Sequence, residues 1–188
     1  ATILGAAKLT GKPGKGWNLG MIHALTQREY AAIDLNGMRD SAQVEPFAYY
    51  GVVRTLKEFG QGRKGLGFLG TLVSRDMKDS SLESQMPRSA AAFGLDGWWF
   101  LDKSKVWVLS GWWGTSRVNG TSEQIRDLQL GFPHYYGRPD ADHITFNPDA
   151  TSLTGWAGRV ELNKEKGNFL FNAAVGAVSP GFDVRDSG

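Results

Sequence analysis

The feature that most constrains this chain is a regular alternation between tight turns and long polar loops, with strand-like sequence between them. Four tight turns, rich in Gly and Lys, fall at residues 12–16, 60–64, 102–105 and 163–167. Long polar loops lie at residues 34–46, 78–88 and 119–142. Outer-membrane barrels connect their strands in this way, with short turns on one side and long loops on the other. The alternation therefore predicts an all-β fold, an antiparallel up-and-down transmembrane β-barrel.

The segments between the turns alternate in polarity, as strands with two different faces do. Phe93, Leu95 and Trp99 fall on one side of such a segment, whereas Asp96 and Trp98 fall on the other. Roughly eight segments have this character, each about 9–14 residues long, where a tilted membrane strand needs about 9–11. Strands in soluble proteins average about 5–6 residues. Eight strands are enough to close a small barrel with a filled interior, and a pore needs more.

Alternation alone does not separate a membrane barrel from a soluble lipocalin-like barrel, because the two differ only in which face is apolar. The positions of the tryptophans favour the membrane. Trp17, Trp107 and Trp156 fall near tight turns or strand ends, and Trp98 and Trp99 fall close to the third turn. Aromatic girdles occupy such positions at the bilayer interface. One helix is predicted outside the strands, at 122–130 in the longest loop, with Thr121 or Ser122 as its N-cap.

Composition excludes several classes of function. The formal net charge of the 188 residues is +2 and no basic stripe is present, so no nucleic-acid partner is predicted. The chain has no Cys, which excludes a disulfide scaffold, a thiolate metal site and a Cys nucleophile. No apolar run reaches the ~18 residues of a transmembrane helix. Gly-x-Ser-x-Gly, phosphate-loop and Rossmann motifs are absent as well, so we predict neither an enzyme nor a cofactor.

The ends of the chain suggest a longer polypeptide. The sequence begins at Ala1 within a strand-like run and stops at Gly188 within a loop-like run. We therefore expect residues 1–188 to be a single barrel region and a fragment of a larger protein, whose complete barrel has more strands.

Five stretches of the sequence together resemble one known family. They are Ile3–Gly11, Gly16–Gly20, Arg138–Asp140, Thr151–Gly158 and Ser179–Val184. In this order and spacing they are similar to the barrel region of the DUF5916 family, and the similarity extends from Ile3 to Asp186. The family comprises outer-membrane proteins of Bacteroidota, Gemmatimonadota and related bacteria, with an upstream region that resembles a family 9 carbohydrate-binding module. The resemblance implies an outer-membrane location and no defined activity.

Two groups of residues are candidates for binding. Phe132, Tyr135 and Tyr136 in the longest loop could stack on a sugar ring, or could instead pack the loop onto the barrel rim. The polar faces of clear strands carry a second group, which would look inward in a barrel and line a pore, hold a plug or form a static network of ion pairs. This second group consists of Lys8, Asp96, Arg159 and Glu161.

Two overlapping sets of residues carry groups that can bind metal ions. His134, Asp140, Asp142 and His143 offer nitrogen and oxygen ligands for a divalent metal, and Asp140, Asp142, Asn147 and Asp149 offer oxygen ligands for calcium. Neither spacing matches a known metal-binding motif, and the glycine that allows an EF-hand loop to turn is missing. A solvated polar loop is the favoured interpretation, so no metal site is predicted.

The sequence is compatible with three functions. The first is an outer-membrane protein, porin-like, for uptake or surface handling of glycan-like or other small solutes. The second is a scaffold barrel that anchors a partner or an extracellular assembly. A soluble lipocalin-like binder is the third. The predicted partners are the lipid bilayer and, through the long loops, proteins or glycan.

Overall fold

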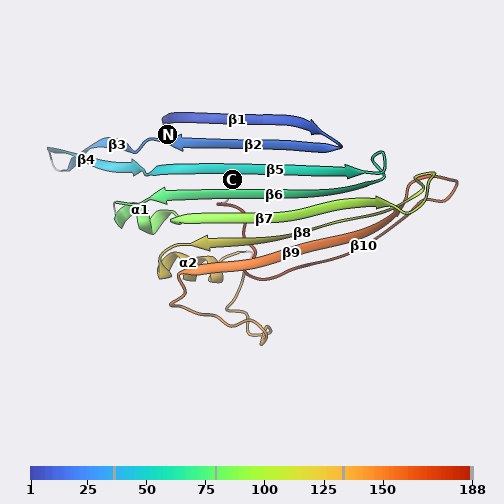
Figure 1. Cartoon of the computed structure of the whole chain (residues 1–188). Helices are drawn as coiled ribbons and strands as arrows, with labels where there is room; N and C mark the ends of the chain where they lie inside the picture. The colour runs from blue at the N-terminus through green and yellow to red at the C-terminus, as the bar shows by residue number, and fades with distance from the viewer. Residues whose placement is uncertain (36, 79, 133, 187–188) are drawn as a thin grey trace.

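The computed structural model describes residues 1–35, 37–78, 80–132 and 134–186. Eight long strands form one antiparallel sheet in the order β1-β2-β5-β6-β7-β8-β9-β10 (Figure 1). They are β1 (Ile3–Gly14), β2 (Trp17–Thr26), β5 (Phe47–Phe59), β6 (Lys64–Asp76), β7 (Ser89–Phe100), β8 (Trp107–Asn119), β9 (Ser152–Lys164) and β10 (Phe171–Val178). An antiparallel up-and-down arrangement of eight main strands is therefore confirmed.

The sheet is open in the part of the chain that the structure describes. β1 and β10 are its two edges, and no pairing joins them. The predicted closure into a barrel is thus not seen between these two strands. Every one of the twelve residues of β1 is exposed, as are all eight of β10.

The tight turns all lie at one end of the sheet, at the right of Figure 1, and we refer to this end as the turn end. Backbone conformation explains the Gly and Lys content of these turns. Gly14, Lys15 and Gly16 have φ values of 98°, 51° and 78°, in the left-handed region where glycine is favoured. A Cβ on Gly16 would also lie 2.6 Å from the carbonyl oxygen of Glu58, so this position requires glycine.

The opposite end, which we refer to as the loop end, differs from the prediction in two places. The expected loop at 34–46 is mostly a hairpin of two strands, β3 (Glu29–Leu35) and β4 (Met38–Glu45), which form a sheet of their own. The preceding strand β2 ends at Thr26, before the hairpin begins. In Figure 1 the hairpin projects beyond the main sheet.

Two short helices complete the loop end. Helix α2 (Ser122–Leu130) has the predicted bounds, and Thr121 is its N-cap in a capping box with Gln124. Helix α1 (Ser80–Gln85) was not predicted and lies within the expected loop at 78–88. Neither helix in the described part of the chain is long and apolar enough to cross a membrane.

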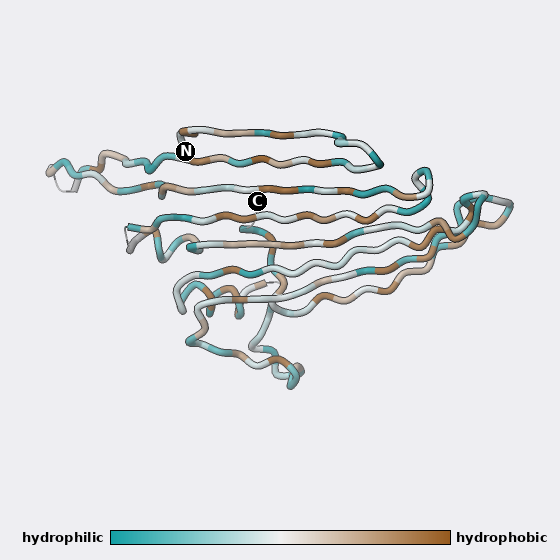
Figure 2. The backbone as a smooth tube through the Cα atoms, in the orientation of Figure 1, coloured by the Kyte–Doolittle hydropathy of each residue, from teal (hydrophilic) through white to brown (hydrophobic). Residues whose placement is uncertain are grey.

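The strand register sorts the side chains onto two faces, because directly opposed residues point to the same side of a sheet. One face, here the apolar face, carries mostly large apolar side chains. These include Trp17, Met21, Leu66, Phe68, Leu72, Phe93, Leu95, Trp99, Leu109, Trp113, Trp156, Val160 and Val175. The tube in Figure 2 alternates accordingly between hydrophobic and hydrophilic colours along the strands.

The other face, here the mixed face, combines charged, small and apolar residues. Its members include Lys8, Arg54, Gly65, Gly67, Leu69, Ala90, Asp96, Trp98, Ser110, Trp112, Val118, Leu153, Gly155, Arg159 and Glu161. Helix α2 covers its loop end, where Ile125 packs on Ala90, Val118 and Leu153 in the buried core. Helix α2 thus covers the mixed face at the loop end, and the turn end of that face stays open.

Candidate functional site

The mixed face carries an open groove near the turn end, with a volume of about 490 Å³. Strands β7, β8 and β9 supply its side chains. The groove is lined by Asp96, Trp98, Ser110, Trp112, Arg159 and Glu161, and we refer to it as the central groove. Cross-strand pairing explains this gathering, because Asp96 lies opposite Trp112, and Trp112 lies opposite Arg159.

Three of the four polar residues predicted to share an inward face line this groove. Asp96, Arg159 and Glu161 are there, and Lys8 lies farther away on β1 of the same mixed face. Their predicted placement on one face agrees with the register.

Each carboxylate of the groove has a guanidinium partner. Arg54 binds Asp96 with both of its terminal nitrogens, one of them at 2.7 Å. Arg159 lies 3.2 Å from Glu161, which also accepts hydrogen bonds from Ser110 at 3.2 Å and Asn163 at 3.3 Å. The charges of the groove are therefore balanced pair by pair.

Two glycines of β6 make room for the large side chains beside them. A Cβ on Gly65 would lie 2.2 Å from the indole of Trp98, and a Cβ on Gly67 would lie 2.6 Å from the Arg54 guanidinium. The Trp98 indole consequently extends over β6, and its Nε1 donates to the Gly62 carbonyl at 3.1 Å. The lack of side chains at Gly65 and Gly67 thus leaves the space over β6 that Trp98 and Arg54 occupy.

This arrangement suits a neutral solute with several hydroxyl groups. An indole offers an apolar face on which the C–H side of a sugar ring can stack, and the Trp112 side chain is 46% exposed. Carboxylates and guanidinium groups beside it supply acceptors and donors for hydroxyls. Because Asp96 and Glu161 are already paired, the groove has little net charge with which to attract an ion.

A second, mostly apolar pocket of about 280 Å³ adjoins the central groove and shares Asp96 and Trp112 with it. Its floor is the mixed face of the sheet, and Phe182 and Val184 of the C-terminal segment form its other side. The backbone of Phe182 passes so close to Gly155 that a Cβ there would lie 2.0 Å from the Phe182 nitrogen. Residues 179–185 therefore cross the mixed face in contact with the strands.

A buried cluster holds this C-terminal segment in place. The His134 Nε2 lies 3.1 Å from Asp183, and the His134 Nδ1 lies beside the Pro180 carbonyl. The Asp183 amide donates to the Ser116 hydroxyl at 2.8 Å, which ties the segment to β8. Burial by itself raises the pKa of Asp183, but hydrogen bonds from Arg185 and His134 outweigh it and lower that pKa to about 2.

The three aromatic residues predicted to bind a sugar separate into two environments. Phe132 and Tyr135 form an exposed edge-to-face pair with ring centroids 5.6 Å apart. Tyr136 instead packs against the buried core beneath α2, and burial raises its pKa. Only Phe132 and Tyr135 therefore form an accessible platform, whereas Tyr136 packs the loop onto the sheet.

The residues weighed as metal ligands are also dispersed. His134 is buried against Asp183, whereas Asp140 pairs with Arg138 on the surface. Asn147 accepts a hydrogen bond from the Asp149 amide within its own turn. No group of three or more His, Cys, Asp or Glu side chains among the described residues is arranged to hold a metal ion.

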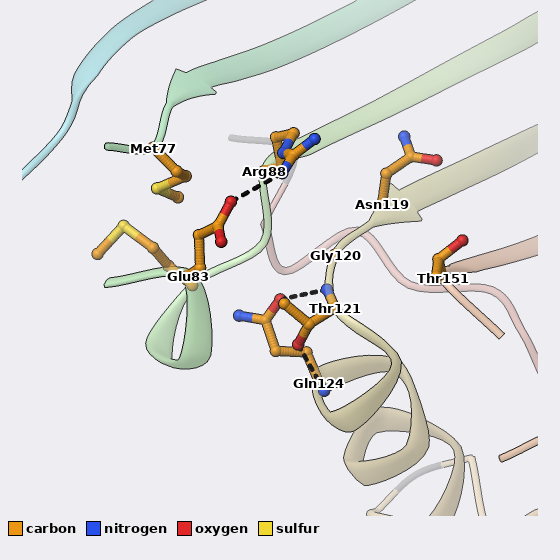
Figure 3. A pocket seen from close by; sticks show the side chains of 9 residues that line it. Met77, Glu83, Arg88, Asn119, Gly120, Thr121, Gln124 and Thr151 are labelled. Atoms are coloured by element: carbon orange, nitrogen blue, oxygen red, sulfur yellow. Dashed lines mark hydrogen bonds and ion pairs between the residues drawn. The ribbon is translucent and has the colours of Figure 1, made fainter. Parts of the chain in front are cut away.

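A further pocket of about 380 Å³ lies at the loop end between the two helices (Figure 3). Glu83 and Arg88, 2.7 Å apart, form one wall, and the capping box of Thr121 and Gln124 forms another. These polar groups bind one another, as the charged groups of the central groove do, and the described residues that line the pocket include no exposed indole on which a sugar ring could stack.

Sequence reasoning missed the two groove tryptophans and the partner of His134. The doublets Trp98-Trp99 and Trp112-Trp113 carried a signal, because consecutive residues of a strand must point to opposite faces. One indole of each doublet must therefore lie on the same face as the polar residues. No local signal connects His134 with Asp183, which is 49 residues away in the chain.

Comparison with known proteins gives a family and no characterised relative. The family model described as a domain of unknown function (DUF5916) matches residues 1–188. No curated protein matches the chain, and no solved structure matches it. Because the family model covers the whole length, the chain belongs to the DUF5916 family.

Proposed function

We propose that this chain is a β-barrel region of a bacterial outer membrane, with its apolar face against lipid and its mixed face lining the interior. In this position it serves the uptake or surface handling of small polar solutes such as glycans, which bind in the central groove. The proposal assigns no catalytic residue. Its strongest support is the apolar face, which no element covers in the described part of the chain.

The exposed area of this face is too large for an ordinary soluble surface. Fifteen large apolar side chains on it are each at least 37% exposed. They are Leu9, Trp17, Leu25, Phe59, Leu66, Leu72, Phe93, Leu95, Trp99, Leu109, Trp113, Trp156, Val160, Phe171 and Val175. At about 70 Å² or more apiece they expose on the order of 1,000 Å², whereas the largest patch on a typical soluble monomer is about 300–600 Å².

The length of the apolar face also fits a bilayer. On β6 the polar residues that border it are Lys64 and Ser74, and on β9 they are Lys164 and Thr154. About nine residues lie between the two borders of each strand, close to the 9–11 that a tilted strand needs to cross the hydrocarbon. The apolar band therefore has the thickness that the proposal requires.

Several polar side chains within the band have partners inside the protein, which lowers the cost of placing them in lipid. His23 and Tyr49 on adjacent strands bind each other through Nδ1 and the phenol hydroxyl, and their rings stack. Thr115 donates to the Gly155 carbonyl at 2.8 Å. A lipocalin-like protein would instead place its apolar face inward and cover it, so this exposed face favours the membrane over the soluble alternative.

The proposal includes closure of the sheet. The outer edges of β1 and β10 carry backbone N–H and C=O groups that lipid cannot satisfy. In the membrane these edges would pair with each other or with further strands of the same protein.

A scaffold barrel that anchors a partner is the second candidate, and one observation favours it. Helix α2 covers the loop end of the mixed face, and residues 179–185 cross that face as far as the pocket beside the central groove, so in a closed barrel both would lie inside and narrow the lumen. Solute passage would then be slow or absent, and the exposed Phe132–Tyr135 pair would serve as a contact for the partner.

Fractionation of cells that produce the full-length protein tests the membrane assignment. We expect a band that only detergent extracts and whose gel mobility changes on heating, as a folded barrel gives. A band in the soluble fraction would contradict the proposal.

Solute handling is then tested with a matched pair of variants in proteoliposomes. Trp112→Ala removes an indole of the central groove, and Trp113→Ala removes the neighbouring indole from the apolar face. The quenching of tryptophan fluorescence by oligosaccharides should change in Trp112→Ala and persist in Trp113→Ala. The same result is expected for liposome swelling. No binding and no swelling by the unaltered protein would favour the scaffold.

A further inference from the structure

Basic residues of two kinds are segregated between the two ends of the sheet. The turns and adjoining strand ends at the turn end carry nine basic residues and three acidic ones, a formal charge of +6. Eight of the nine are lysines, and we refer to the nine together as the turn-end collar: Lys12, Lys15, Lys57, Arg63, Lys64, Lys103, Lys105, Lys164 and Lys166. The connections and adjoining strand ends at the loop end also carry nine basic residues, of which eight are arginines, but fourteen acidic residues outnumber them.

The basic residues at the two ends also differ in how they are paired. Five of the eight loop-end arginines have a carboxylate partner, such as Asp76 for Arg28 and Glu83 for Arg88, each at 2.7 Å. In the described part of the chain, no collar residue has a carboxylate oxygen within 4.0 Å. The acidic Asp102 binds the backbone amides of Val106 and Trp107 in its own turn instead. The charge of the collar is therefore left without an internal counterion.

Three collar lysines lie where the aromatic border of the apolar face meets the turns. The Lys64 ammonium is 4.5 Å from the ring centroid of Trp99. Those of Lys57 and Lys164 lie 5.1 Å from Trp17 and 6.0 Å from Trp107. In each case the apolar stem lies along the apolar face, and the ammonium stands at its polar border, as lysines do at a membrane surface.

This position coincides with the phosphate level of a bilayer whose hydrocarbon the apolar face would span. We propose that the turn-end collar is a docking surface for the head groups of anionic phospholipids, with Lys57, Lys64 and Lys164 as its principal contacts. The inference rests on the proposed membrane location and adds a partner at a different surface from the central groove.

Lysine suits this partner better than arginine does. Its ammonium is a compact charge on a flexible stem with three donors, so it can follow a phosphate group whose position varies from lipid to lipid. The planar guanidinium suits a fixed partner that it can bind with two nitrogens, as Arg54 binds Asp96. Mobile lipid phosphates thus account for the lysines at the turn end, and fixed carboxylates account for the arginines that pair with them at the loop end.

The test uses the full-length protein in phosphatidylcholine nanodiscs that contain a brominated lipid tracer. Bromine quenches the tryptophans beside the collar, Trp17, Trp99 and Trp107, according to how often the tracer occupies that position. We expect brominated phosphatidylglycerol to be enriched there roughly fivefold or more over brominated phosphatidylcholine, and high salt to weaken this preference.

Matched variants assign the preference to the collar. The triple change Lys57→Gln, Lys64→Gln and Lys164→Gln should bring the enrichment close to one, and the corresponding triple change to Arg should keep most of it. An equal loss of charge at the loop end, through Arg39→Gln, Arg126→Gln and Arg138→Gln, should leave the enrichment unchanged.

The outcomes separate this inference from the proposed function. Equal quenching by both tracers, or a preference that survives the triple change to Gln, would overturn the lipid-docking inference and leave the membrane location intact. Failure of the protein to enter nanodiscs, with no quenching by either tracer, would contradict the proposed function itself. Quenching by the phosphatidylcholine tracer in every variant verifies that each has folded into the bilayer.

Discussion

Trp112 and Trp113 are consecutive residues whose indoles lie on opposite faces of the sheet, yet they are exposed to almost the same extent, 46% and 47%. Trp112 belongs to the central groove beside Asp96 and Arg159, whereas Trp113 belongs to the apolar face beside Leu95. Successive side chains of a strand point to opposite faces of the sheet, which places the two indoles in different environments. Neighbouring positions on one strand can therefore be changed to compare the two faces while depth in the sheet stays nearly constant.

An arginine on the apolar face should be costly in proportion to its depth. Leu95 lies about midway between the two borders of the band, so Leu95→Arg should lower the free energy of unfolding by about 2–4 kcal/mol. Leu109 lies closer to the turn end, beside Trp99, and Leu109→Arg should cost about 1 kcal/mol or less. Urea titration of the protein folded into vesicles measures both values.

The control for this comparison is Ser110→Arg, next to Leu109 but on the mixed face, where Glu161 is a neighbour. This change should alter the free energy of unfolding by no more than about 0.5 kcal/mol. If all three arginines are tolerated equally in detergent-free buffer, the apolar face does not contact lipid.

A methyl group at Gly155 should displace the C-terminal segment. Its Cβ would lie 2.0 Å from the Phe182 nitrogen and 2.2 Å from the Gly181 carbonyl carbon, and backbone atoms cannot move aside as a flexible side chain can. We expect Gly155→Ala to cost about 1–3 kcal/mol and to expose the amide of Asp183 to solvent. Hydrogen exchange at residues 181–185 measures the displacement.

Gly94→Ala is the matched substitution, because Gly94 also lies on the mixed face but its added Cβ would meet nothing closer than 3.6 Å. Exchange at residues 181–185 should stay slow in that variant. Equal protection in the two variants would show that the segment does not press on Gly155.

Local alternation made most of the main sheet predictable. Phe93, Leu95 and Trp99 fall on one face and Asp96 and Trp98 on the other, as their spacing predicts, since a strand gives each residue only two directions. Helix α2 was predictable for a similar reason, because Thr121 and Gln124 form a capping box whose signal is contained within four residues.

Features that depend on contacts between distant segments were not predictable. Asp34 and Arg39 are polar residues that are typical of a loop. They nevertheless lie opposite each other in the β3–β4 hairpin, where backbone pairing outweighs the lack of apolar side chains. Closeness in sequence groups His134 with Asp140. The fold buries it against Asp183 instead, and no periodic pattern encodes that contact.

Stability should fall in acid because of Asp183. The pKa of this carboxyl is lowered from 3.8 to about 2 in the folded protein by Arg185 and His134, against the opposing effect of burial. A lowered pKa stabilises the fold at pH values above that of the unfolded chain, and this stabilisation is lost as the pH falls from about 4 toward 2. It amounts to roughly 2 kcal/mol.

Unfolding measured between pH 2 and pH 6 tests this dependence, with Asp183→Asn as the comparison. The variant should be less stable than the unaltered protein at pH 6, and the difference should shrink as the pH approaches 2. A difference that does not change over this range would mean that Asp183 carries no charge-dependent contact with Arg185.

Loss of the N-cap should loosen helix α2 and the cover that it provides over the mixed face. The Thr121 hydroxyl accepts a hydrogen bond from the Gln124 amide at 3.3 Å, and the Gln124 side chain accepts one from the Thr121 amide at 3.0 Å. Thr121→Ala removes the first of these bonds and should destabilise the helix by about 1 kcal/mol, whereas Thr121→Ser should retain it.

Because Ile125 seals the core against Ala90 and Val118, faster hydrogen exchange in α2 should be accompanied by faster exchange at the loop ends of β7 and β8 in the alanine variant. Faster exchange in α2 alone would mean that the helix frays without uncovering the sheet, and unchanged exchange would mean that packing of Ile125, not the cap, holds the helix.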